Sequence, residues 1–221
     1  MLNNFQAIVF DMDGLLLDSE TIALATFVEA CKECGYDLHD MEPYYKCIGT
    51  NWPKATQTLI SGYGKDFPFD AISEVWGKKY HDETLTKPVP VKEGALQLLD
   101  YLEREGMRKV VVTSSRKENS VIKLTNAGLL NYFEFILGGN QIENGKPHPE
   151  MYLTAAEMLN VKPDKCLAIE DSDNGVLSAY NAGMTVIQVP DINQPSDKVK
   201  ALGHTIMSSL TDIERLLKQD S

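Results

Sequence analysis

The chain has 221 residues, of which 43% are hydrophobic and 24% charged, a composition typical of a globular protein with one or two domains. Its formal net charge of −11 provides no electrostatic attraction to a nucleic-acid backbone or to an anionic membrane surface. We therefore expect no nucleic acid and no membrane as partner, and a small anionic substrate would need a local basic site or a metal ion.

No segment of the sequence predicts export or membrane insertion. The first ten residues contain no basic segment followed by a long apolar stretch. No later apolar run approaches the roughly 20 residues that span a bilayer. We expect a cytoplasmic protein, and nothing in the sequence requires more than a monomer.

Two of the four cysteines, Cys31 and Cys34, have the CxxC spacing of redox and zinc motifs. No second CxxC follows, and both continue the apolar stripe of Leu24, Phe27 and Val28 at helical spacing. We interpret them as reduced, buried side chains of a helix.

Five short apolar runs are typical of strands that are buried on both faces. They are residues 7–10, 110–112, 133–137, 166–169 and 185–189. Helical patterns lie between the later runs, and three of these helices are followed by a glycine, as expected where a helix ends in the left-handed conformation. The glycines are Gly106, Gly128 and Gly183. This alternation predicts an α/β fold with a doubly wound parallel sheet and a Rossmann-like core.

Residues 17–87 contain no apolar run of the strand type and several helical segments broken by glycine and proline. We predict a small all-helical cap, inserted after the first strand into a core made of residues 1–16 and 88–221. Asp18 or Ser19 is expected to cap the first helix of this segment and Asp70 a later one. The chain crosses between core and cap twice, as a hinged lid requires.

Acidic and hydroxyl side chains follow three of the predicted strands at the points where the strands end. They are Asp11 and Asp13, Thr113 and Ser114, and Glu170 and Asp171. The carboxyl ends of parallel strands meet at one edge of a sheet, so these side chains would form an oxygen-rich pocket suited to Mg²⁺. Lys146 is the lone basic group expected there. Each of these features alone is typical of a turn or a helix cap. Their occurrence together at the ends of successive strands favours a functional site.

The stretch DMDGLLLDSE, residues 11–20, resembles DxDGxLxDS, the first signature of the haloacid dehalogenase superfamily of phosphotransferases with an aspartate nucleophile. Thr113-Ser114 looks like the second signature, Lys146 in GKPHPEMY like the third, and Glu170-Asp171 in AIEDSDNG like the fourth. The helical segment is similar to the cap of the branch that contains β-phosphoglucomutase and many small-molecule phosphatases.

The resemblance implies that Asp11 attacks phosphorus to form an aspartyl-phosphate, and that Asp13 is the general acid and base. We expect burial and the charge of Asp11 to raise the pKa of Asp13, so that it can donate a proton.

The resemblance also implies that Mg²⁺ is bound by the Asp11 carboxylate, the Asp13 main-chain carbonyl and Asp171, with Glu170 close by. Thr113, the Ser114 backbone N–H and Lys146 would bind the phosphoryl oxygens.

Two positions of the cap depart from β-phosphoglucomutase, which carries a histidine on the first cap helix and an arginine, in a GxxR turn, that grips a second phosphate. Ala23 and Trp52 occupy these positions in an ungapped comparison. We therefore expect hydrolysis of a small phosphorylated metabolite, a sugar or polyol monophosphate. Trp52 and Lys78 are candidate contacts to the leaving group.

Three alternatives stay open. A phosphosugar mutase would use the same core residues. A phospho-accepting receiver module also places an aspartate, a Thr or Ser and a lysine at parallel-strand ends, but it needs neither the helical segment nor Asp13. An inactive binding module could share the fold, because fold alone does not establish function.

Overall fold

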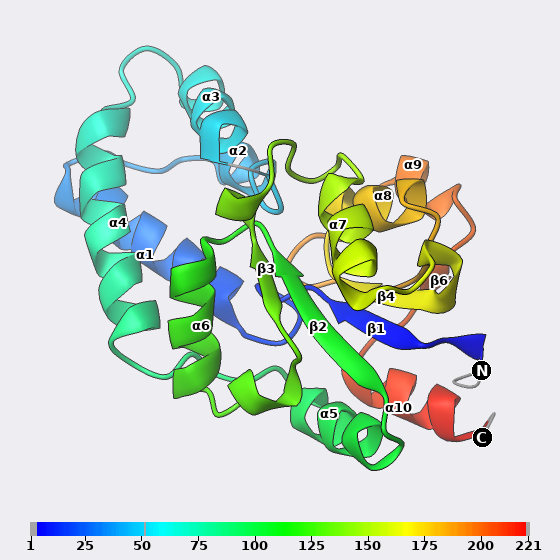
Figure 1. Ribbon diagram of the computed structural model, residues 1–221. Helices are drawn as coiled ribbons and strands as arrows, with labels where there is room; N and C mark the ends of the chain where they lie inside the picture. Colours follow the sequence, from blue (N-terminus) through cyan, green and yellow to red (C-terminus); the bar gives the residue numbers. More distant parts are fainter. Residues whose placement is uncertain (1–3, 51, 220–221) are drawn as a thin grey trace.

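The computed structural model describes residues 4–50 and 52–219, which form a six-stranded parallel sheet with helices on both faces (Figure 1). The strand order is β3-β2-β1-β4-β5-β6. The strands are β1 (Ala7–Phe10), β2 (Arg108–Thr113), β3 (Ile136–Gly138), β4 (Cys166–Glu170), β5 (Thr185–Gln188) and β6 (Thr205–Ile206). The predicted fold class is confirmed.

Two strand predictions needed correction. β3 begins at Ile136 rather than at Phe133, because Phe133 follows a 3₁₀ turn, Leu130–Tyr132. β6 was missed because it has only two residues, both exposed at the sheet edge, and so produces no apolar run.

Alternate residues of the strands pack on opposite layers of helices, which explains why the strands are continuously apolar. Ile8 and Phe10 belong to the cluster beneath α5 (Ala95–Arg104), α6 (Lys117–Asn126) and α10 (Leu210–Gln219). Ala7 and Val9 belong to the cluster beneath α7 (Glu150–Leu159), α8 (Asp173–Asn181) and α9 (Asp197–Lys200). A doubly wound sheet buries both faces in this way.

The segment predicted to be the cap contains four helices in its described residues: α1 (Ser19–Glu33), α2 (Glu42–Tyr45), α3 (Trp52–Tyr63) and α4 (Phe69–Leu85). They have an apolar cluster of their own, in which the Phe27 ring lies 4.7 Å from the Tyr44 ring and 5.1 Å from the Trp76 ring, measured between centroids. Figure 1 shows the cap helices to one side of the sheet. Cys31 is buried and Cys34 half-buried, both as free thiols, whereas Val28, which was predicted to share their face, is 42% exposed.

The predicted helix starts were partly wrong. Asp18 occupies the N-cap position of α1, but its side chain caps no backbone N–H and instead accepts a hydrogen bond from the Thr21 hydroxyl. Ser19 donates a hydrogen bond to the Asp13 carboxylate, which is a strong acceptor because it is charged. Asp70 lies inside the first turn of α4, which begins at Phe69.

The predicted helix ends are confirmed, since the three glycines have positive φ values of 67°, 74° and 81°; they are Gly106, Gly128 and Gly183. The longest helix in residues 4–50 and 52–219 is α4, with 17 residues. No helix in those ranges has the length and apolarity needed to cross a membrane.

Candidate active site

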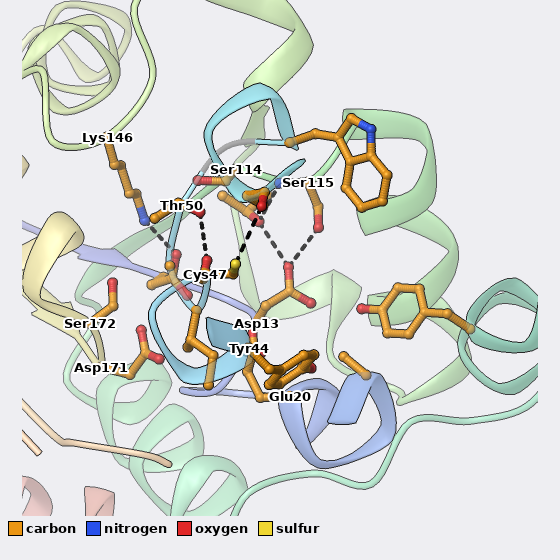
Figure 2. A pocket seen from close by; sticks show the side chains of 18 of the residues that line it. Asp13, Glu20, Tyr44, Cys47, Thr50, Ser114, Ser115, Lys146, Asp171 and Ser172 are labelled. Carbon is orange, nitrogen blue, oxygen red and sulfur yellow. Dashed lines mark hydrogen bonds and ion pairs between the residues drawn. The ribbon is translucent and has the colours of Figure 1, made fainter. Parts of the chain in front are cut away.

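The predicted strand ends converge on one pocket. β1 lies between β2 and β4, and Phe10 is level with Val111 and Ile169, so the residues that follow these three strands share one edge of the sheet. A cavity of about 250 Å³ opens there between the strand ends and the cap helices. Figure 2 shows Asp13, Lys146 and Asp171 around this cavity.

Three carboxylates form an acidic cluster beside Lys146. Asp11, Glu170 and Asp171 are buried, and one oxygen from each lies within 4.8 Å of the others. The Lys146 ammonium donates to Asp11 Oδ1 at 2.5 Å and to Glu170 Oε1 at 2.6 Å, and the Tyr152 hydroxyl also donates to Glu170. Burial, together with the neighbouring carboxylates, raises the pKa of Asp171 well above its usual range.

The acidic cluster fits a divalent cation. Its three carboxylates face one ammonium, which leaves an excess of negative charge that hard cations with oxygen ligands neutralise. Asp191 adds a buried Oδ2 atom that has no hydrogen-bond partner among the described residues. Gly14 allows the close approach: it has φ +85°, and a Cβ there would lie 2.5 Å from Asp171 Oδ2.

Asp13 has a different set of partners from Asp11. Its Oδ1 accepts from the Ser19 hydroxyl at 2.7 Å and from the Lys123 ammonium at 2.8 Å. Its Oδ2 accepts from the Ser115 hydroxyl at 2.7 Å and from the Thr113 hydroxyl at 3.1 Å. Four donors therefore fix the orientation of this carboxylate.

The expected rise in the pKa of Asp13 was wrong for the protein without substrate. Burial does act to raise the pKa, but the charge of Lys123 and the hydrogen bonds from Lys123, Ser19 and Ser115 outweigh it and lower the pKa to about 2. A close cation and several hydrogen bonds together stabilise the anion by more than the cost of desolvation.

The cap contributes an aromatic wall and one charge to the cavity. Tyr44, Trp52, Trp76 and Tyr80 line it, and Glu20 is the sole charged cap residue among the described residues that line it. Burial, with the charges of Asp13 and Asp191, raises the pKa of Glu20 to about 7. The cap side of the cavity is therefore neutral or negative.

Sequence comparison decides the family. Residues 8–189 match the family described as haloacid dehalogenase-like hydrolase. The chain belongs to this family. It is 33% identical over 197 residues to the Bacillus subtilis protein named "Putative phosphatase YhcW", with 84% of each chain covered.

This haloacid dehalogenase-like hydrolase is also similar to a second curated protein and to a solved structure over most of its length. A Thermotoga maritima protein named "Phosphorylated carbohydrates phosphatase" is 27% identical, with 81% of this chain and 82% of that protein covered. The crystal structure of a β-phosphoglucomutase from Clostridium difficile matches with a TM-score of 0.76 and 20% identity, covering 98% of this chain and 96% of that one. This last likeness shows the fold alone.

In this haloacid dehalogenase-like hydrolase, Lys123 is a site residue that the sequence reasoning missed. Lys146 was expected to be the lone basic group, but Lys123 is also buried, at 1% exposure, and contacts Asp13. The available signal was its place on the buried face of α6, three residues after Ser120 and next to Leu124. A lysine at such a position is rarely buried without a partner.

The two predicted phosphate-binding residues of the second signature lie at the cavity with different partners. Thr113 is buried, and its hydroxyl donates to Asp13 and accepts from the Ser115 N–H at 3.1 Å. Ser114 is exposed at the cavity rim, as Figure 2 shows. The role of both in phosphate binding stays a prediction.

The two cap residues predicted to contact substrate differ in position. Trp52 lines the cavity with 55% of its surface exposed. Lys78 lies on the exposed side of α4 and pairs with Glu74 at 2.7 Å, and it is absent from the cavity lining in the described residues. The predicted contact of Lys78 with substrate stays a prediction, and the face of α4 that reaches the cavity carries Trp76 and Tyr80.

Proposed function

We propose that the chain is a Mg²⁺-dependent phosphatase that hydrolyses sugar or polyol monophosphates through an aspartyl-phosphate at Asp11. One observation carries this proposal. Asp11 and Asp13 are two residues apart, yet Asp11 lies in the acidic cluster with Lys146, whereas Asp13 is held by Lys123 and three hydroxyls. The different surroundings suit a nucleophile beside a metal and a separate acid and base.

In the first step a carboxylate oxygen of Asp11 attacks phosphorus, and the bond from phosphorus to the ester oxygen breaks. Lys146, 2.5 Å from Asp11 Oδ1, reduces the repulsion between this carboxylate and the phosphate. Mg²⁺ held by Asp11, Asp171 and the Asp13 carbonyl, with Glu170 close by, would neutralise further negative charge on the phosphate. Thr113 and the Ser114 N–H would bind phosphoryl oxygens.

Asp13 would transfer protons in both steps. It donates a proton to the leaving ester oxygen, then removes one from the water that attacks the aspartyl-phosphate. The free protein holds Asp13 ionised. A bound phosphate dianion would add negative charge nearby and so favour the protonated form that the first step requires.

The cap supports a leaving group without a second anionic group. Glu20 is the charged cap residue at the cavity, and no cap lysine or arginine in the described residues lines it. The aromatic wall of Tyr44, Trp76 and Tyr80 suits the apolar face of a sugar ring. The Thermotoga maritima relative named for phosphorylated carbohydrates points to the same substrate class.

The test is phosphate release from a panel of sugar and polyol monophosphates, with and without Mg²⁺. We expect Mg²⁺-dependent release that is lost in Asp11→Asn. Glucose 1-phosphate supplied with glucose 1,6-bisphosphate distinguishes the mutase, because isomerisation without net phosphate release would establish it. A stable phosphoprotein without turnover would favour a receiver, and no reaction at all would favour a binding module.

A further inference from the structure

Lys123 connects Asp13 to the cap. It lies on α6 of the core, and its ammonium donates to Asp13 Oδ1 at 2.8 Å and to the hydroxyl of Tyr80 at 2.8 Å. Tyr80 lies on α4 of the cap and lines the cavity. One buried ammonium thus contacts both the Asp13 carboxylate and a residue of helix α4.

The burial of Lys123 suggests a role beyond packing. A lysine side chain at 1% exposure has lost its hydration, and such groups are found inside proteins where a charge partner compensates. Desolvation acts to lower the pKa of Lys123, but the Coulomb interactions and hydrogen bonds with Asp13 and Tyr80 together outweigh it and raise the pKa above its usual range. The ammonium is a fixed positive charge 2.8 Å from the carboxylate that the mechanism requires to move protons.

We propose that Lys123 is a positioning residue that orients the Asp13 carboxylate for proton transfer and ties that orientation to the cap through Tyr80. This inference rests on the proposed phosphatase function.

The proposed role of Lys123 concerns the step that forms the aspartyl-phosphate. Asp11 forms a bond to phosphorus, the electron pair of the breaking phosphorus–oxygen bond passes to the ester oxygen, and that oxygen takes the proton from the Asp13 carboxyl group. A carboxyl group whose orientation is loose transfers this proton less efficiently. The loss matters for an alkoxide, which is a poor leaving group, and little for p-nitrophenolate, which leaves without a proton.

The test compares Lys123→Met with the unmodified protein on glycerol 3-phosphate and on p-nitrophenyl phosphate, both with saturating Mg²⁺. We expect kcat/KM to fall about 100-fold for the glycerol ester and less than about threefold for the p-nitrophenyl ester, because general acid catalysis typically contributes 10²-fold or more. An equal fall on both esters, or no fall, would overturn the inference.

Two further variants keep the result interpretable if Lys123→Met folds poorly. Tyr80→Phe removes one hydroxyl and leaves the ion pair, so we expect a smaller loss with the same preference for the glycerol ester. Lys117→Met removes the other lysine of α6, which does not line the cavity, and should change neither rate. An equal loss on both esters in Tyr80→Phe would refute the link to the cap.

The activity of the unmodified protein on the two esters distinguishes failure of the phosphatase proposal from failure of the proposed role of Lys123. If it hydrolyses both esters and Lys123→Met shows no ester preference, the phosphatase proposal stands and the role of Lys123 fails. If the unmodified protein hydrolyses neither ester, both proposals fail together.

Discussion

At the scale of single residues, the four signature segments predicted most of the site. Asp11, Asp13, Glu170 and Asp171 follow strands that the apolar runs revealed, and the structure gathers them at one edge of the sheet. The sequence alone did not show which side chain forms an ion pair or hydrogen bond with each carboxylate. The low pKa of Asp13 depends on Lys123, a residue 110 positions away that no local pattern connects to it.

A prediction about substrate choice concerns Glu20. With its pKa raised to about 7, Glu20 is neutral at lower pH and becomes negative as the pH rises through that value. Discrimination against substrates with a second anionic group should therefore increase above about pH 7. In Glu20→Gln we expect kcat/KM for such a substrate to rise about fivefold relative to the matched monophosphate, which corresponds to about 1 kcal/mol of repulsion.

The control for Glu20 is Glu29→Gln, a neutralised carboxylate on the same helix that points to solvent and pairs with Lys79. It should leave the substrate ratio unchanged at every pH. A ratio that keeps its pH dependence in Glu20→Gln would show that another group sets the discrimination.

At the scale of elements, the strand and helix pattern was predictable because a doubly wound sheet makes its strands apolar on both faces. The helix starts were less predictable, since the Ser19 hydroxyl donates a hydrogen bond to Asp13. The hydrogen bond to Asp13 exists because the chain returns at the β1 end, and this is a tertiary contact that capping rules do not contain.

The turn after β1 yields a prediction about Gly14. Alanine there would adopt a positive φ and place its Cβ 2.5 Å from Asp171 Oδ2 and 3.2 Å from Asp191 Oδ2. We expect Gly14→Ala to lose about 1–3 kcal/mol of stability, by thermal unfolding, and about tenfold or more in Mg²⁺ affinity, by calorimetric titration.

Gly35→Ala is the matched control for Gly14. Gly35 also has a positive φ, +71°, but a Cβ there meets no atom within 4 Å. It should show a comparable loss of stability with unchanged Mg²⁺ affinity. Equal Mg²⁺ affinities in the two variants would remove the proposed role of Gly14 in shaping the metal site.

At the scale of the whole molecule, the buried carboxylates link stability to pH and to the metal. Burial raises the pKa of Asp11 despite the opposing charge of Lys146, and burial with Asp11 and Glu170 raises the pKa of Asp171. Without metal, the folded protein therefore retains protons that the unfolded chain loses above about pH 4. These two groups make the folded state less stable as the pH rises.

This linkage predicts how Mg²⁺ changes the melting temperature. Because a bound cation replaces those protons, the increase in Tm on adding Mg²⁺ should be larger at about pH 8 than at about pH 5.5. Calorimetric scans in EDTA and in saturating Mg²⁺ measure it, and Asp171→Asn should abolish most of the increase. An increase that shrinks with rising pH would contradict the assignment of these carboxylates as metal ligands.

The proposed function requires that Asp11 carry the phosphoryl group during turnover. The most direct measurement is rapid mixing of the protein with Mg²⁺ and a reactive phosphomonoester, followed by acid quenching and peptide mapping by mass spectrometry. We expect a transient phosphoryl group on the peptide that contains Asp11, absent from Asp11→Asn. Phosphate release without any phosphorylated peptide, or unchanged release in Asp11→Asn, would contradict it.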